Sequence, residues 1–197
     1  AKIKKLITKL SSTESRILIS GPTGSGKELV ARKIHKNSSR SKEPFIVLNG
    51  ALLQPDNYEV ELFGAENKNG SISYGFLEKA KNGTLLIDEV SEIPLETQAK
   101  ILRVLIDQKF KRHNGNKDIN VNIRIISSTS KDLKSEVAIG NFREDLYHRL
   151  NVVPVEIPKL SSRTEDIPAL INYFQKKIAE INGIPEIKIN TDDDLLY

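Results

Sequence analysis

A glycine-rich segment that ends in lysine is the first stretch of the sequence whose residue types could do chemistry. Glycines allow the backbone to curl so that successive amide N–H groups point at one anion. A lysine at the end of such a segment adds a full positive charge for the outer phosphates of a nucleotide. We therefore expect a phosphate-binding loop for a nucleotide. The segment reads, in order, Gly21, Pro22, Thr23, Gly24, Ser25, Gly26 and Lys27.

The residue that follows the lysine, Glu28, departs from the usual composition of such loops. Most phosphate-binding loops place there a Ser or Thr whose hydroxyl binds Mg²⁺. A carboxylate is repelled by a phosphate unless it faces away or meets a metal ion or water. Glu28 is therefore a candidate cofactor contact, and on chemistry alone it weakens the expectation of an ordinary Mg²⁺ site.

Two adjacent carboxylates follow an apolar run at residues 84–87. We expect Asp88 to reach Mg²⁺ through water and Glu89 to polarise a water molecule for in-line attack on the γ-phosphate. Adjacent acids also occur at helix starts, but the phosphate loop upstream favours the catalytic interpretation. Asn49, which follows another apolar run, is a candidate to hold Glu89, and a turn-forming asparagine is the alternative.

These candidate residues follow short apolar runs that alternate with helical periodicities. The alternation predicts an α/β fold, in which helices wrap a parallel sheet. In the helix after the phosphate loop, Leu29, Val30 and Ile34 are expected to turn inward. The polar residues 67–73 are expected to form a loop. Strands are expected at residues 16–20, 45–48, 84–87, 120–127 and 152–157, and helices at residues 1–10, 27–38 and 97–107.

A change of pattern after Pro158 indicates a second subdomain. Residues 164–181 show only a helical period of apolar side chains. We therefore assign residues 1–158 to the α/β nucleotide-binding core and residues 159–197 to the start of a helical lid subdomain, which we expect to be incomplete. Because methionine is absent even at position 1, we expect a piece of a longer chain.

The composition limits the class of protein. Hydrophobic residues make up 38% and charged residues 28% of the 197 residues, as in ordinary soluble globular proteins. No run approaches the length of a membrane helix, and the absence of cysteine excludes disulfides and fits a cytoplasmic protein. The net charge of +4 is too small to argue nucleic-acid binding, and the early basic residues fit a solvated helix face or a phosphate-attracting surface.

The three histidines have no metal-ligand spacing and support no hydrolase triad. We expect His35 and His113 to lie at the surface. His148 is expected to pack against its neighbours rather than to catalyse.

Several ordered motifs resemble those of sigma-54-dependent activators, the AAA+ proteins of the NtrC class. The phosphate loop continues as Glu28-Leu29-Val30-Ala31, and in that class a glutamate routinely follows the lysine. The resemblance implies an AAA+ core that binds ATP and Mg²⁺ and assembles into a homo-oligomeric ring. Further similar segments lie at residues 61–64, 82–89, 98–105, 142–154 and 165–168.

The resemblance also implies roles for residues outside the phosphate loop. Arg143 and Arg149 match two arginines that reach the nucleotide of a neighbouring subunit, where a guanidinium stabilises charge on phosphoryl oxygens. Surface ion pairs with Glu144 and Asp145 are the alternative. Asn49 matches a residue that restrains the catalytic glutamate until the target is engaged.

Ser130 stands at the end of a segment that matches the first sensor of the class. The class usually has asparagine at this position. A serine hydroxyl donates one hydrogen bond and has a shorter reach than an amide. The resemblance therefore implies a γ-phosphate contact for Ser130, and the substitution weakens that expectation.

The largest departure from the class lies between Gly64 and Gly75. Active members carry Gly-Ala-Phe-Thr-Gly-Ala at the tip of a loop that grips the sigma factor. Here the segment is about four residues shorter, and its only aromatic residue is Tyr74. NtrX-type regulators also lack this motif, and the sequences of residues 105–110 and 124–129 are similar to theirs.

The resemblance therefore implies an ATP-binding oligomerisation module of a two-component transcription regulator, with weak ATPase activity at most. Sigma-54 polymerase is not expected as a partner, and no membrane contact is expected. The expected partners are DNA, through a C-terminal helix-turn-helix, and a sensor kinase, through a receiver domain, both outside this sequence. The alternative is an active, ATP-hydrolysing sigma-54 activator. A metabolic kinase lacks support because no acceptor site is evident.

Overall fold

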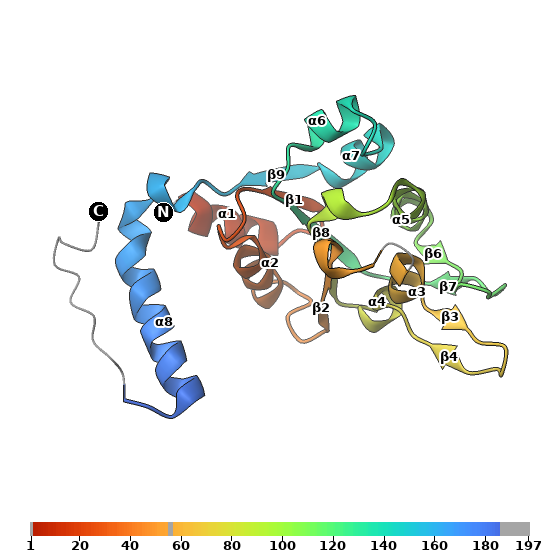
Figure 1. The fold of residues 1–197 in the computed structure, drawn as a ribbon, viewed down its shortest axis with the longest axis horizontal. Helices are drawn as coiled ribbons and strands as arrows, with labels where there is room; N and C mark the ends of the chain where they lie inside the picture. The colour runs from red at the N-terminus through yellow and green to blue at the C-terminus, as the bar shows by residue number, and fades with distance from the viewer. Residues whose placement is uncertain (1, 55–56, 186–197) are drawn as a thin grey trace. The chain divides into compact units, whose positions relative to one another are not determined.

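The computed structural model describes residues 2–54 and 57–185. Its centre is a sheet of five parallel strands in the order β2-β5-β8-β1-β9 (Figure 1). The strands are short apolar runs, as expected where both faces of a parallel sheet are covered. The predicted α/β fold is confirmed. The strands are β1 (Ile17–Ser20), β2 (Phe45–Asn49), β5 (Thr84–Asp88), β8 (Arg124–Thr129) and β9 (Val153–Glu156).

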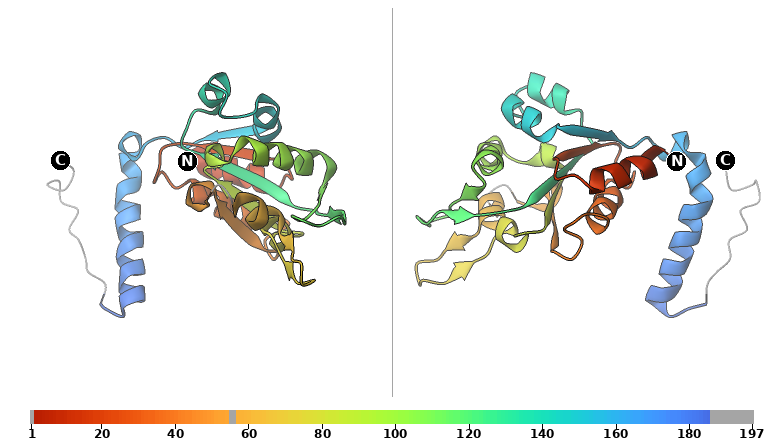
Figure 2. Two further views of the ribbon diagram at one scale, coloured as in Figure 1. Left: turned by 45° about the vertical axis from the view of Figure 1, so that its right-hand side comes forward. Right: turned by 180° about the vertical axis from the view of Figure 1, so that it is seen from behind.

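Helices cover both faces of the sheet, and alternate strand residues point to opposite faces (Figures 1 and 2). Ile17, Ile19 and Leu86 face the side covered by α1 and α2, whereas Leu85 and Ile87 face the other helices. The helices that precede Pro158 are α1 (Lys2–Ser11), α2 (Lys27–Lys36), α3 (Tyr58–Phe63), α4 (Phe76–Lys79), α5 (Leu95–Asp107), α6 (Leu133–Ala138) and α7 (Glu144–Leu150), with the 3-10 turns η1 (Gly50–Leu52) and η3 (Val90–Glu92).

Within α2, the prediction of an inward-facing side chain is wrong for one of the three residues. Ile34 is fully buried and Val30 packs against the same core, but the Leu29 side chain is 59% exposed. Leu29 and Val30 are neighbours about 100° apart on the helix, so a face centred on Ala31 and Ile34 does not include Leu29.

The expected single strand at residues 120–127 is wrong, because the structure divides it in two. Its first residue belongs to β7 (Ile119–Asn120), which pairs with β6 (Lys109–Phe110) in a separate antiparallel hairpin. Residues 124–127 belong to β8 of the central sheet. Buried Val121 and Ile123 lie between the two strands, so the apolar pattern continues across the break.

The expected loop at residues 67–73 is also partly wrong. Its last two residues form β4 (Ile72–Ser73), which pairs with β3 (Ala65–Glu66) in a second hairpin. The two hairpins lie side by side, because Glu66 N donates to His113 O at 3.0 Å and His113 N donates to Gly64 O at 2.9 Å. The segment is therefore an ordered hairpin joined to the β6–β7 region.

The chain divides into two compact units between Ile157 and Pro158. The second unit contains the turns η4 (Leu160–Ser162) and η5 (Thr164–Asp166) and the helix α8 (Ile167–Asn182). A proline in its first turn and a left-handed Gly183 at its C-cap explain where α8 begins and ends. That the first unit is a nucleotide-binding core and the second the start of a lid stays a prediction, and residues 186–197 lie outside the described residues.

His35 is buried, so its expected surface position is wrong. Its ring packs on Phe45 with centroids 5.1 Å apart, and its Nδ1 lies 2.9 Å from Thr84 Oγ1. Burial lowers the pKa of His35 below its ordinary value of 6.5, and the positive charge of Arg124 lowers it further. His148, by contrast, is exposed beside Tyr147, and does not pack in the core.

The buried His35 predicts a specific loss of stability in mild acid. Because the pKa of His35 is lower in the folded chain, the unfolded chain takes up the proton first as the pH falls below about 6.5. The stability is fully present above that pH and decreases towards the folded pKa. Urea unfolding between pH 7.5 and 5 should show this decrease in the wild type and in His148→Gln. His35→Gln should lack that part of the decrease, and an identical pH profile for all three proteins would contradict the account.

Candidate nucleotide-binding site

The loop between β1 and α2 has the backbone shape of an anion cradle. Gly24 and Gly26 have φ angles of +76° and +94°, which L side chains rarely adopt. The loop begins against β8, because Gly21 N donates to Thr129 O at 3.2 Å. It leads directly into the N-terminus of α2, whose free N–H groups and positive dipole end attract anions.

Lys27 folds back over this loop. Its Nζ lies 3.0 Å from Gly21 O and 3.3 Å from Pro22 O, and the residue is only 6% exposed. Nζ also lies 3.1 Å from Glu89 Oε1. The ammonium group therefore sits between the phosphate loop and the carboxylate that follows β5.

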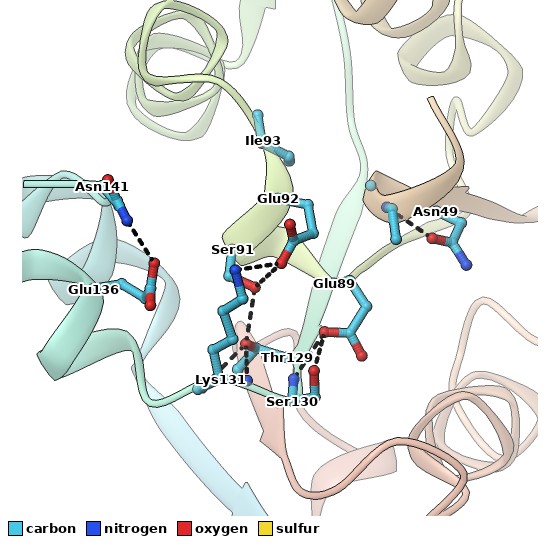
Figure 3. A network of polar contacts seen from close by, with 12 residues as sticks. Asn49, Glu89, Ser91, Glu92, Ile93, Thr129, Ser130, Lys131, Glu136 and Asn141 are labelled. Atoms are coloured by element: carbon cyan, nitrogen blue, oxygen red, sulfur yellow. Dashed lines mark hydrogen bonds and ion pairs between the residues drawn. The ribbon is translucent and has the colours of Figure 1, made fainter. Parts of the chain in front are cut away.

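Glu89 is held by two partners. Its Oε1 pairs with Lys27, and its Oε2 accepts hydrogen bonds from Ser130 N and Ser130 Oγ, both at 2.8 Å (Figure 3). Burial alone raises the pKa of Glu89, but the hydrogen bonds from Ser130 and the contact with Lys27 outweigh it, so the pKa lies below its ordinary value. Glu89 is thus a carboxylate at neutral pH. It also has a φ of +51°, an unusual backbone conformation for a residue with a side chain.

Asp88 and Asn49 lie side by side on neighbouring strands. They are register partners in β5 and β2, and Asn49 Nδ2 lies 3.5 Å from Asp88 Oδ2. Asn49 Oδ1 accepts from Ala51 N at 2.9 Å, which is the turn-forming role. Ser128 Oγ, which the sequence did not single out, donates to Asp88 Oδ1. The structure therefore brings Asn49 to Asp88, while Ser130 and Lys27 contact Glu89. Figure 3 shows the contact between Glu89 and Ser130.

The Glu28 side chain points into an ion pair one helical turn further along α2. Glu28 Oε1 lies 2.7 Å from an Arg32 nitrogen, and both side chains are about half exposed. This pairing keeps the Glu28 carboxylate occupied beside the phosphate loop. It gives a physical reason why a glutamate is tolerated after Lys27.

Arg143 and Arg149 are both exposed and lie at the two ends of α7. Arg143 forms an ion pair with Asp145, with Nη2 and Oδ2 2.8 Å apart, as the surface ion-pair alternative proposed. Arg149 lies close enough to Arg16 for its charge, after burial, to lower the pKa of Arg16. Arg16 precedes β1, whereas the phosphate loop follows β1, so Arg149 lies towards the opposite edge of the sheet from the loop of its own chain.

The types of side chain present are compatible with an Mg²⁺ site made of oxygen ligands. Asp88 offers a carboxylate at the edge of the sheet, beside the hydroxyl of Ser128. Among the residues that the structure describes, no group of three or more His, Asp or Glu side chains could hold a metal by itself. Mg²⁺ at nucleotide sites is usually held by one or two carboxylates together with phosphate oxygens and water, so a single carboxylate is compatible with it.

Comparison with known proteins identifies the family. Residues 1–156 match the Sigma-54 interaction domain family. The chain belongs to this family. It is 47% identical over 191 residues to the nitrogen assimilation regulatory protein NtrX of Azorhizobium caulinodans. The match covers 96% of this chain but only 42% of the relative.

Solved structures agree with this assignment to the Sigma-54 interaction domain. NtrX from Brucella abortus has a TM-score of 0.92 and 51% identity, and the match covers 97% of this chain and 44% of that one. The structure of the same protein in complex with ATP has a TM-score of 0.89, with 97% and 42% of the two chains covered. The chain thus spans about two fifths of the length of these relatives. Within its described part, this domain contains no helix long and apolar enough to cross a membrane.

Proposed function

We propose that this Sigma-54 interaction domain binds ATP with Mg²⁺ and serves as the oligomerisation module of an NtrX-like two-component transcription regulator. The observation that carries the proposal is the contact between Lys27, in the loop after β1, and Glu89, directly after β5, at 3.1 Å. A cation and a potential base meet there beside an anion cradle. The similarity to an NtrX that was solved in complex with ATP supports the same ligand.

The residues divide the work at the nucleotide. Backbone N–H groups of the loop between Pro22 and Lys27, and the charge of Lys27, hold the phosphates. Asp88 would hold Mg²⁺ through water, and the ion would neutralise charge on the phosphates. Glu89, a carboxylate at neutral pH, orients the attacking water and accepts its proton. Ser130 lies at hydrogen-bonding distance from Glu89 and remains our candidate for contact with the γ-phosphate.

Hydrolysis is completed by a neighbouring subunit in this proposal. Arg143 and Arg149 are exposed, and Arg149 lies towards the edge of the sheet opposite its own phosphate loop. A guanidinium contributed across a subunit interface stabilises the charge that develops on the transferred phosphoryl group. ATP binding therefore also sets the contacts between subunits. The ring then positions DNA-binding helix-turn-helix domains, under control of a receiver domain that takes phosphate from a sensor kinase.

The segment between Gly64 and Gly75 does not support contact with sigma-54 polymerase in this proposal. It forms a short hairpin with a polar tip instead of a long loop with an aromatic grip. The family match favours a second candidate function, an active sigma-54 activator, because the family is described by that interaction. A transcription assay, argued in the Discussion, separates the two functions.

Nucleotide binding is tested by Lys27→Ala. This substitution removes the only cation that the phosphate loop places on the outer phosphates, and charged hydrogen bonds contribute about 1.5–3 kcal/mol each. We expect ATP affinity to fall by roughly 100-fold or more. The measurement is the rise in melting temperature with ATP concentration, taken relative to each protein without nucleotide.

Lys36→Ala is the matched control, because Lys36 is an exposed lysine at the end of the same helix. It should gain as much thermal stability from ATP as the wild type. A Lys27→Ala protein stabilised like the wild type would exclude the proposed site.

A further inference from the structure

One buried side chain, Gln98, joins the segment after Glu89 to the segment that begins α7. Gln98 lies in the first turns of α5 and has no exposed surface. Its Nε2 donates to Ile93 O at 2.7 Å and to Asn141 O at 3.0 Å, and its Oε1 accepts from Arg143 N at 2.9 Å. Both amide donors and the amide acceptor therefore contact the main chain of other segments.

The first of these segments begins at the candidate base. Glu89 is the N-cap of η3, and Glu92 N donates back to Glu89 O at 3.0 Å. Ile93 N donates to Val90 O at 3.4 Å in the same turn. The Ile93 carbonyl, which Gln98 contacts, is therefore linked to Glu89 through four peptide units of ordered backbone. Figure 3 shows Glu89, Glu92 and Ile93 along this turn.

The second segment contains Arg143, whose side chain is exposed to solvent. Arg143 is the N-cap of α7, and its backbone N–H is one of the groups that Gln98 fixes. Asn141 belongs to the same segment, and its carbonyl is the other group; its side chain contacts Glu136 (Figure 3). The guanidinium itself is free to leave Asp145, since that ion pair is about half exposed and such pairs are weak.

Packing alone does not explain a glutamine at this position. A buried amide is favourable only when its hydrogen bonds are made, and an apolar side chain of similar volume fills such a position without that requirement. Near η3, the contact between Lys131 and Glu92 at 2.9 Å is also polar, but those side chains are partly exposed. Gln98 is a buried polar link between the two segments, which also meet through the apolar side chains of Phe142, Val90 and Ile93 in one core cluster.

We propose that Gln98 is a positioning residue, which sets Arg143 for action on the nucleotide of the neighbouring subunit and ties that arginine to the backbone beside Glu89. The inference rests on the proposed function, because it requires Arg143 to act in trans. A shift of Glu89 on binding nucleotide is then passed through Ile93 and one amide group to Arg143. The nucleotide state of one subunit thereby affects the position of the arginine that acts on the next subunit.

The test is a subunit-mixing assay with the complete gene product. Gln98→Met keeps the approximate volume and removes all three hydrogen bonds, so alone it should hydrolyse ATP at least about tenfold more slowly than the wild type. Its own phosphate loop and Glu89 are unchanged, so ATP binding should be retained. Glu89→Gln subunits lack the base but present an intact Arg143.

Mixing these two impaired proteins should restore hydrolysis. In a randomly mixed ring, roughly a quarter of the interfaces combine an intact site with an intact, positioned arginine. We therefore expect a rate near that fraction of the wild-type rate. Arg143→Ala mixed with Glu89→Gln is the reference pair, and Gln98→Met mixed with Arg143→Ala should stay inactive, because neither subunit supplies the arginine.

A second substitution guards against a folding defect. Burial favours the neutral form of a glutamate in Gln98→Glu, and that form still accepts from Arg143 N and donates one hydrogen bond. Gln98→Glu should therefore retain most of the activity that Gln98→Met loses. A merely structural role predicts instead that loss of activity follows loss of melting temperature in both variants.

The outcomes separate this inference from the function on which it rests. If Arg143→Ala and Glu89→Gln do not restore each other, the arginine does not act in trans, and both the proposed mechanism and this inference are wrong. If that pair restores activity but Gln98→Met with Glu89→Gln does not, Gln98 serves its own site and only the inference fails. Wild-type hydrolysis by Gln98→Met alone also overturns it.

Discussion

Replacing Glu89 with glutamine is expected to stop ATP hydrolysis while ATP binding is preserved. Glutamine has the same shape but cannot accept a proton from the attacking water, and a positioned general base contributes roughly 100- to 10,000-fold to such a reaction. The Glu89 carboxylate is deprotonated at neutral pH, because its pKa lies below its ordinary value, so it can accept a proton. Hydrolysis should therefore fall by a factor in that range.

Binding should not weaken, because Glu89 pairs with the lysine that the phosphates need. Lys27 Nζ lies 3.1 Å from Glu89 Oε1, and ATP must compete with that carboxylate for the ammonium group. In Glu89→Gln this competition is lost, so the affinity for ATP should equal or exceed that of the wild type. Titration with a fluorescent ATP analogue measures the affinity, and phosphate release measures hydrolysis.

Glu92→Gln is the matched control for this substitution. Glu92 lies three residues further along the same turn and forms a partly exposed ion pair with Lys131. Its replacement should leave hydrolysis within about twofold of the wild type, since exposed ion pairs contribute little. Undiminished turnover in Glu89→Gln would mean that another residue, with Asp88 the nearest carboxylate, prepares the water.

The parts of the site that lie close together in the sequence could be predicted from it. The phosphate loop depends on glycines and a lysine within one short segment, and its flanking strand and helix follow from local apolar patterns. The fold class followed from the alternation of such patterns. These features need no knowledge of which strands are neighbours.

Contacts between strands could not be predicted, because they depend on register. Asn49 and Asp88 are partners across β2 and β5, so their side chains lie on the same face and meet. Glu89, one residue later, meets Ser130 at the end of β8 instead. The sequence shows two adjacent acids and one asparagine, but not which acid the asparagine reaches. The buried Gln98 and His35 were missed for the same reason, since their partners are distant in the chain.

We also expect that ATP will not enable this protein to activate sigma-54 polymerase. Remodelling requires a loop that extends towards the target and presents an aromatic side chain. Here the tip of the β3–β4 hairpin is closed by polar contacts, with Asn67 N donating to Ser71 O and Gly70 N to Asn67 O, both at 2.9 Å. The tip offers no aromatic group, so a shift of the hairpin would bring no aromatic side chain to the polymerase.

The aromatic residue that the segment does contain lies at the base of the hairpin. Tyr74 packs beside the Arg112 guanidinium, 5.5 Å from the centre of its ring. Arg112 is in turn held by Glu78 at 2.7 Å and by Glu66 at 3.1 Å, which fastens the hairpin to the neighbouring one. Tyr74 is 59% exposed, but it lies at the base of the hairpin and not at its tip, where a gripping side chain is needed.

The measurement is formation of open promoter complexes by purified sigma-54 polymerase with the complete gene product, ATP and a phosphate mimic. We expect no ATP-dependent complexes above the level without activator, whereas an established activator of the NtrC class should form them in parallel. A graft of the Gly-Ala-Phe-Thr-Gly-Ala loop between Gly64 and Gly75 tests the cause: partial recovery would show that the short hairpin was the missing part. A graft that folds and hydrolyses ATP but stays inactive would assign the defect elsewhere, with Ser130 the first candidate. ATP-dependent open complexes with the unmodified protein would contradict our interpretation of the hairpin and make the active sigma-54 activator the better description.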